Sequence, residues 1–143
     1  MKAFIDTSVI VPALIDQLPN HQAALLALSE NANEPNQAIC STHSLAECYA
    51  VFTALPLARR ITPSEAQQLI TESIAGRLTV RGLTRADYLE ATALVAQRGL
   101  LSGAIYDALH VVAAIRAQSE RIVTYNVRHF LSLAPDHITV VTP

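Results

Sequence analysis

The first nine residues, Met1-Lys-Ala-Phe-Ile-Asp-Thr-Ser-Val9, constrain the fold of this chain more than any other stretch. The apolar run over residues 3–5 predicts a short buried strand, and the residues from Thr7 onward predict a helix that follows at once. Asp6 lies at the junction. Open α/β sheets bind ligands at the carboxyl ends of their strands, so an acid at this point is well placed for chemistry. A simpler interpretation is that Asp6 or Thr7 caps the helix.

Short apolar runs alternate with helical segments along the rest of the chain. The pattern predicts strands over residues 3–5, 38–40, 78–80, 121–124 and 138–142. It predicts helices over residues 7–17, 20–29, 44–55, 62–76, 84–98 and 103–118. This alternation indicates an α/β fold with a mostly parallel central sheet of four to five strands, covered by helices on both faces. We expect residues 1–143 to form a single domain.

Three helix starts carry recognisable capping signals. Ser44-Leu-Ala-Glu47 matches a capping box and predicts that the third helix begins at Ser44. Thr62-Pro-Ser-Glu65 combines a cap, a proline at the first helical position and a glutamate at the third. Thr84-Arg-Ala-Asp87 starts a further helix, and Gly99 is expected to end it.

Composition narrows the classes of protein to consider. Hydrophobic residues make up 51% of the chain and charged residues only 15%, which is typical of a globular domain with a real core. The net charge of −2 does not indicate a protein that grips duplex DNA by its phosphates. Cys40 and Cys48 form no C-x-x-C motif, so we expect reduced thiols in a cytoplasmic protein. No uninterrupted apolar run reaches about 18 residues, so we expect no membrane span.

Four polar residues fall where strands end or where a helix is otherwise apolar. Asp6 ends the first strand, Glu47 lies in the first turns of the helix after the second strand, and Asn126 follows the fourth strand directly. Asp107 lies in a helix that is apolar on nearly every side, so we expect it to be at least half buried. Because the carboxyl ends of parallel strands share one edge of a sheet, these residues are expected to face one crevice.

Each of these residues also has a structural interpretation. Glu47 could serve only as a capping glutamate, and Asn126 only as a turn or cap residue. Asp107 could form a buried ion pair with an arginine. Taken together, however, carboxylates about 5 Å apart repel by roughly 3 kcal/mol per pair at an effective dielectric near 20. A shared proton, an arginine or a divalent cation would relieve that repulsion, and oxygen ligands select hard ions such as Mg²⁺ or Mn²⁺.

The order and spacing of these motifs resemble those of the PIN-domain ribonucleases, specifically the VapC toxins of bacterial toxin–antitoxin pairs. The resemblance covers essentially the whole chain. It rests on Phe4-Ile-Asp6-Thr-Ser-Val9, Ser44-Leu-Ala-Glu47, Tyr106-Asp107-Ala-Leu-His110 and Thr124-Tyr-Asn126-Val-Arg-His-Phe130. It implies a PIN-like three-layer α/β/α fold, a metal-dependent endoribonuclease acting on tRNA or ribosomal RNA, a homodimer, and a cognate VapB-type antitoxin.

The resemblance also implies a role for each site residue. Asp6, Glu47 and Asp107 match the three main acidic positions and would hold Mg²⁺ or Mn²⁺. Asn126 falls where many relatives have a fourth acid, and it would contribute to catalysis by a hydrogen bond to water or to phosphate. The missing charge at this position argues against a firmly held second metal.

Other interpretations make different demands on the sequence. A dinucleotide-binding domain would need a G-x-G-x-x-G motif, which the chain lacks. An aspartyl-phosphate enzyme would need a lysine late in the chain, and Lys2 is the only lysine. A catalytically weak PIN-like protein that binds RNA or a partner remains an alternative. The histidines show no metal-ligand spacing, and His110, three residues after Asp107, is expected to pack in the core rather than touch the site.

Overall fold

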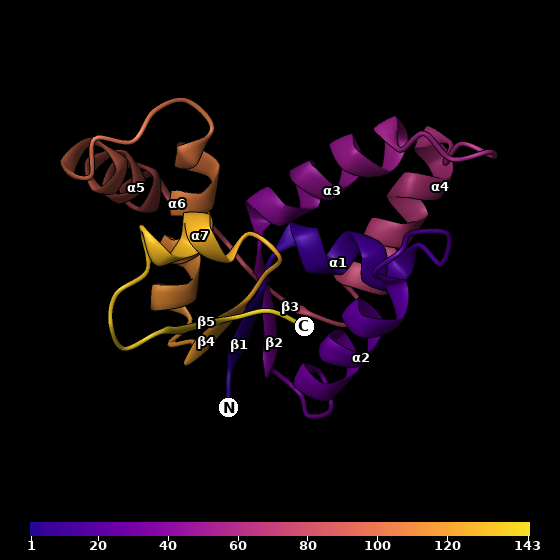
Figure 1. Ribbon diagram of the computed structural model, residues 1–143, viewed down its shortest axis with the longest axis horizontal. Coiled ribbons are helices and arrows are strands. Elements are labelled where there is room, and N and C mark those ends of the chain that lie inside the picture. Colours follow the sequence, from indigo (N-terminus) through magenta and orange to yellow (C-terminus); the bar gives the residue numbers. More distant parts are fainter.

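The chain folds around one five-stranded sheet, in the strand order β3-β2-β1-β4-β5 (Figure 1). The computed structural model describes all residues 1–143. The strands are β1 (Ala3–Ile5), β2 (Ala38–Ser41), β3 (Thr79–Arg81), β4 (Arg121–Val123) and β5 (Thr139–Val141). Every neighbouring pair is parallel, which confirms the predicted α/β class and the predicted number of strands.

Helices cover both faces of this sheet and make three layers. The helices are α1 (Thr7–Leu14), α2 (His21–Asn31), α3 (Thr42–Ala54), α4 (Pro63–Gln68), α5 (Arg85–Gln97), α6 (Ala104–Arg116) and α7 (Val127–Leu131). In Figure 1, α1 to α4 gather on one side of the sheet and α5 to α7 on the other. The two faces of β1 show why: Ile5 belongs to one hydrophobic core and Phe4 to the other. Alternate side chains of a strand point to opposite faces, so both faces need a cover.

The central position of β1 brings three strand ends together. Ala3 pairs with Ala38 of β2 on one side and with Arg121 of β4 on the other. The backbone N–H of Asp6 then donates to the carbonyl oxygen of Val123 at 3.0 Å. Because all three strands run in one direction, the segments that follow them leave the sheet at a common edge.

The start of α3 differs from the prediction. The helix begins at Thr42 with Ser41 as its N-cap, and Ser41 and Ser44 form the capping box through reciprocal hydrogen bonds. Ser44 therefore occupies the third helical position rather than the cap. Glu47 lies in the second turn, where no capping role is open to it, because the Ser44 hydroxyl already accepts the N–H of Ser41.

Other element boundaries also depart from the sequence pattern. Helix α1 ends at Leu14, short of the predicted residue 17. The predicted helix over residues 62–76 starts as expected but becomes a π-helix over Leu69–Ile74. It ends near Gly76, where a Cβ would lie 2.4 Å from the carbonyl oxygen of Glu72. The short helix α7 was not predicted.

No helix combines the length and the apolar character that crossing a membrane requires.

Candidate metal-binding active site

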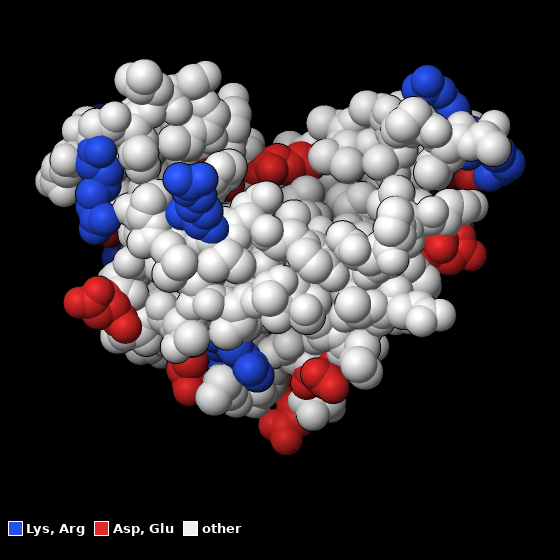
Figure 2. Space-filling view, viewed as in Figure 1, with Lys and Arg blue, Asp and Glu red and all other residues white.

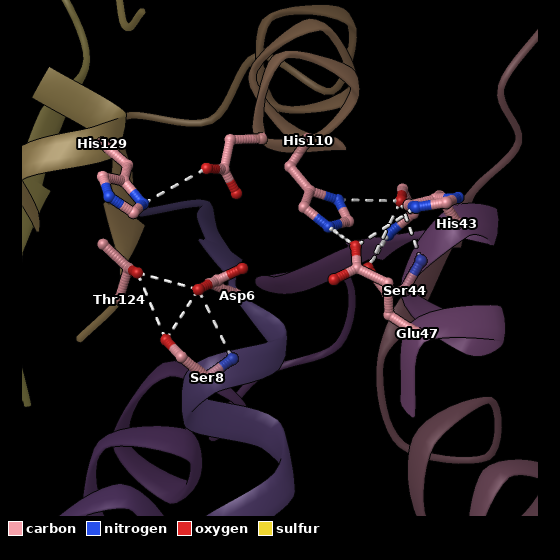
Figure 3. A network of polar contacts seen from close by, with 10 residues as sticks. Asp6, Ser8, His43, Ser44, Glu47, His110, Thr124 and His129 are labelled. Atoms are coloured by element: carbon pink, nitrogen blue, oxygen red, sulfur yellow. Dashed lines mark hydrogen bonds and ion pairs between the residues drawn. The ribbon is translucent and has the colours of Figure 1, made fainter. Parts of the chain in front are cut away.

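Asp6 is held firmly at the end of β1 by one of its two oxygens. Its Oδ2 accepts hydrogen bonds from the hydroxyls of Ser8 at 2.6 Å and Thr124 at 2.8 Å (Figure 3). Each hydroxyl oxygen also accepts a backbone N–H, from Tyr125 and Asn126 respectively, so its own proton is free to point at Asp6. The Oδ1 atom has no hydrogen-bond partner in the protein. The carboxylate is thus oriented with one oxygen available.

The capping interpretation of Asp6 is also correct. Asp6 is the N-cap of α1, and its Oδ2 accepts the backbone N–H of Ser8 at 3.4 Å. This bond is longer than the two hydroxyl contacts, so the hydroxyls contribute more to the orientation. The residue is only 3% exposed. A single acid therefore starts the helix and presents an oxygen at the sheet edge.

Glu47 is held by His110 on the opposite side of the groove, and a second histidine, His43, lies close to the same oxygen. Its Oε1 lies 2.5 Å from Nε2 of His110 and 3.4 Å from Nε2 of His43 (Figure 3). Burial raises the pKa of Glu47, but the hydrogen bond from His110 and the electrostatic effects of His110 and His43 outweigh burial and lower the pKa below its ordinary value. Glu47 is therefore an ionised carboxylate with its second oxygen, Oε2, free of hydrogen bonds.

Asp107 has no comparable support. It lies in the first turn of α6 with its side chain 23% exposed, and its nearest ionic partner is Nδ1 of His129 at 3.6 Å from Oδ2. Burial raises the pKa of Asp107, and the negative charge of Asp6 raises it further. The arginine that would explain a buried acid here is absent, because no arginine or lysine forms an ion pair with Asp6, Glu47 or Asp107.

Asn126 follows β4 at the N-cap position of α7. Its side chain makes no capping hydrogen bond and is exposed. Together with Asp6, Glu47 and Asp107 it lines a groove of about 420 Å³. Figure 2 shows acidic atoms at the bottom of a cleft between the two helical halves of the molecule. The structure thus brings all four of the residues predicted from sequence to one groove.

Two histidines belong to this site that the sequence interpretation left out. His110, expected to pack in the core, is fully buried, but it also bonds Glu47, and it joins this glutamate to Ser41. His43 lies one helical turn before Glu47 and stacks on Tyr106, with ring centroids 5.0 Å apart. The four-residue spacing of His43 and Glu47 was visible in the sequence, whereas the contact with His110 spans 63 residues.

The chemistry of the groove fits a hard divalent cation. The available donors are carboxylate oxygens, and the mutual repulsion of Asp6 and Asp107 is the condition that a cation relieves. No three histidine, cysteine, aspartate or glutamate side chains are gathered closely enough to hold a metal ion by themselves. Asp6, Glu47 and Asp107 nevertheless line one groove, where Asp6 and Glu47 each keep one oxygen that has no hydrogen bond.

Comparisons with known proteins agree with this description. The model of the PIN domain family matches residues 3–134. The chain is 34% identical over 116 residues to the ribonuclease VapC27 of Mycobacterium tuberculosis, covering 81% of this chain and 79% of that protein. The chain therefore belongs to the PIN-domain family and, within it, to the VapC ribonucleases. PIN-domain ribonucleases generally depend on a divalent metal.

Solved structures share the fold at low sequence identity. VapC20 of Mycobacterium tuberculosis, a toxin that cleaves the sarcin–ricin loop, superposes with a TM-score of 0.73 at 14% identity, covering 94% of this chain and 98% of that one. VapBC2 of Rickettsia felis, bound to a promoter DNA fragment, gives a TM-score of 0.68 at 20% identity, covering 100% and 99%. A toxin–antitoxin complex of Klebsiella pneumoniae gives 0.63 at 17% identity, covering 96% of each chain.

Proposed function

We propose that this chain is the toxin of a toxin–antitoxin pair and hydrolyses phosphodiester bonds of RNA at the Asp6–Asp107 groove, with Mg²⁺ or Mn²⁺ as cofactor. One observation carries the proposal: Asp6, Glu47 and Asp107 line one groove, and no arginine or lysine neutralises any of them. A fold that needed Asp107 only for stability would pair it with an arginine, as Asp87 is paired with Arg116. The tRNA and ribosomal RNA that the sequence resemblance implies are the proposed substrates.

Asp6 and Asp107 would hold the cation, and Glu47 would complete the set of ligands. A bound divalent cation supplies positive charge that makes water a better nucleophile at neutral pH and stabilises the charge that develops on the phosphate. The protein contributes the orientation of the ligands. The Ser8 and Thr124 hydroxyls hold one oxygen of Asp6, so its other oxygen does not have to be ordered when the cation binds.

Asn126 would act on the substrate rather than on the cation. Its amide is exposed in the groove and has no capping partner, so it is free to donate a hydrogen bond to a phosphate oxygen or to water. Because an amide is neutral, it adds no repulsion to the acids beside it. This substitution for an acid supports a single catalytic cation rather than two.

Arginines on both sides of the groove suit the RNA backbone. Positive atoms lie over α7 and near the loop between α3 and α4, on either side of the acidic cleft (Figure 2). Arg128 of α7 is exposed and forms no ion pair, whereas Arg59 of the loop is paired with Glu65. Arg128 is therefore the better candidate for a phosphate contact. Phosphate contacts of this kind recognise the shape of RNA more than its sequence.

The proposed partners are a VapB-type antitoxin, the RNA substrate and a second copy of the chain in a homodimer. Toxin–antitoxin complexes among the structures with this fold support the antitoxin. Residues 1–143 would act as one domain in the cytoplasm. Two free buried thiols, Cys40 and Cys48, are compatible with a reducing compartment.

The experiment that tests the proposal is RNA cleavage by antitoxin-free protein. Total tRNA and ribosomal RNA are incubated with Mg²⁺ or Mn²⁺, with EDTA, and with the Asp6→Asn variant as control. We expect discrete fragments that disappear with EDTA and in the variant. Absence of cleavage by folded protein with either metal would overturn the proposal in favour of a PIN-like protein that binds RNA or a partner without cutting.

A further inference from the structure

We propose that His110 is a positioning residue that orients Glu47 toward the metal-binding groove, through a buried relay from Ser41 to His110 to Glu47. The inference rests on the part of the proposed function that places a cation in the groove, since the orientation of Glu47 matters only if a cation binds there. His110 is the one fully buried histidine of the chain, and the inference gives it a role in the site.

The contacts of His110 fit one arrangement of donors and acceptors along the relay. Nε2 of His110 donates to Oε1 of Glu47 across their 2.5 Å contact, since carboxylate oxygens accept hydrogen bonds. In the tautomer that carries its proton on Nε2, Nδ1 is an acceptor. Ser41 meets this need, because its Oγ lies 3.1 Å from Nδ1 and already accepts the N–H of Ser44, which leaves its own proton to donate. The contacts thus form one consistent chain of donors.

The position of His110 is fixed by packing on every side. Its side chain is 0% exposed, and its ring packs against Phe4 of β1 with centroids 5.3 Å apart. Ser41 is equally buried and is itself anchored as the N-cap of α3. The ring therefore cannot follow Glu47. Glu47, by contrast, is 30% exposed on a flexible stem, so the histidine determines where the carboxylate points.

The result of this arrangement is a carboxylate with one oxygen fixed and one free. Oε1 bonds His110 and lies 3.4 Å from Nε2 of His43, while Oε2 has no partner and Glu47 lines the groove. Figure 3 shows Glu47 between the histidines on one side and Asp6 on the other. Asp6 is presented in the same way by the hydroxyls of Ser8 and Thr124. Two acids on opposite sides of the groove are thus each oriented through one oxygen.

A competing explanation is that Glu47 merely satisfies a buried histidine. Two substitutions separate the roles. His110→Leu keeps an apolar side chain in the core and removes both hydrogen bonds, whereas His110→Gln retains a side-chain donor. Asp87→Asn, which loses a buried ionic interaction outside the groove, controls for a general loss of stability. Each variant is measured for thermal stability, for the kcat and KM of RNA cleavage, and for Mn²⁺ affinity without RNA.

We expect His110→Leu to lower kcat and Mn²⁺ affinity roughly 10- to 100-fold, with the KM for RNA little changed. His110→Gln should recover most of the kcat and most of the Mn²⁺ affinity. Asp87→Asn should alter neither kcat nor Mn²⁺ affinity. In a Glu47→Gln background, His110→Leu should add no further loss, because the histidine acts through Glu47. Unchanged Mn²⁺ affinity and kcat in folded His110→Leu would overturn the inference while the proposed function stood. If the wild-type protein cuts no RNA, the proposed function fails, and Mn²⁺ affinity alone still decides whether His110 orients Glu47.

Discussion

Asp87 and Asp107 occupy the first turns of neighbouring helices, yet their surroundings are opposite. Asp87 of α5 is 2% exposed, accepts the N–H of Thr84 at 2.9 Å, and pairs with Nε of Arg116 at 3.1 Å. Asp107 of α6 has only the exposed His129 at 3.6 Å. Hydrogen bonds from Thr84 lower the pKa of Asp87, with Arg116 adding to them. Burial and the charge of Asp6 raise the pKa of Asp107.

The surroundings of an acid distinguish one that stabilises the fold from one that is a candidate for function. Asp87 has every partner that an ionised carboxylate needs, and its ionised form is favoured in the folded protein. Asp107 is partly desolvated and repelled by its neighbours, which is a cost unless something else binds there. Position within the helix is nearly the same in both cases, so the contrast comes from the surroundings: partners stabilise the charge of Asp87, whereas burial and Asp6 destabilise that of Asp107.

The largest expected effect comes from substituting Asp107, the acid proposed to bind the cation. Asp107→Asn should reduce RNA cleavage at least about 100-fold, because a cation held there is worth several kcal/mol and each 1.4 kcal/mol is about a factor of ten. Thermal stability at neutral pH in metal-free buffer should not fall, since the substitution removes a charge that Asp6 repels. Fragment yield and the melting temperature check both points. Full cleavage by this variant would remove Asp107 from the mechanism.

The same substitution at Asp87 should lower stability and leave RNA cleavage unchanged. Asp87→Asn should lower the free energy of unfolding by about 2 kcal/mol, the size expected for losing hydrogen bonds to a charged group. The groove is untouched, so kcat should stay near the wild-type value. Denaturant unfolding and cleavage assays on the same preparation measure the two effects. A variant that kept its stability but lost cleavage would invert the comparison.

Stabilisation by a divalent cation should depend on Asp107 and not on Asp87. At a concentration about tenfold above its dissociation constant, Mn²⁺ should stabilise the wild-type protein by about 1.4 kcal/mol, which corresponds to a melting temperature higher by ~4 °C. Asp87→Asn should show the same increment and Asp107→Asn little or none. Melting curves with and without Mn²⁺ supply the test, and Mg²⁺ repeats it. An equal increment in Asp107→Asn would mean that the cation binds elsewhere.

The stabilising part of the Asp87 interaction should depend on pH in a defined direction. Its folded pKa lies below the ordinary value of 3.8, so the folded state binds its proton less tightly than the unfolded state does. The contribution is therefore complete above that value and is lost as the pH falls through the folded pKa. The stability difference between the wild-type protein and Asp87→Asn should be constant near neutral pH and shrink in acid. A difference that persisted undiminished in strong acid would disprove this origin.

The smallest effect concerns the arginines, where the contrast between paired and unpaired charge recurs. Arg128→Ala should weaken RNA binding roughly fivefold at low salt, and less at high salt, because an unpaired arginine is free to replace a phosphate counterion. Arg59→Ala is the control, since Glu65 already occupies this guanidinium through two hydrogen bonds. Titrations at two salt concentrations give both values. Equal losses in the two variants would show that pairing does not govern RNA contact.

Much of the fold could be predicted because its signals are local. The strand over Ala3–Ile5 is a continuous apolar run, and the capping box of Thr84 and Asp87 lies where the sequence indicates it. The predicted start of α3 was wrong because Ser41 and Ser44 are both suitable cap residues. In the structure both are buried, and Ser41 is the N-cap while Ser44 completes the capping box from the third helical position. The π-helical turn over Leu69–Ile74 has no period that a sequence pattern would reveal.

Part of the candidate site could likewise be predicted from the sequence, and part of it could not. Asp6, Glu47, Asp107 and Asn126 could be named from sequence because each follows a strand or interrupts an apolar helix face. Their gathering in one groove follows from parallel strands, which bring their carboxyl ends to one edge. The sequence alone therefore determined the class of fold, the acids and the edge of the sheet where they lie. The roles assigned to them as ligands stay predictions.

Only the tertiary structure decided which partners each acid has. Arg116 meets Asp87 across 29 positions, Thr124 meets Asp6 across 118, and His110 meets Glu47 across 63. These contacts depend on how helices and strands pack, and no local periodicity or spacing reports them. A carboxylate's chemistry is set by the charges and donors within a few ångströms of it, so the sequence located the acids and the packing made one structural and another available for function.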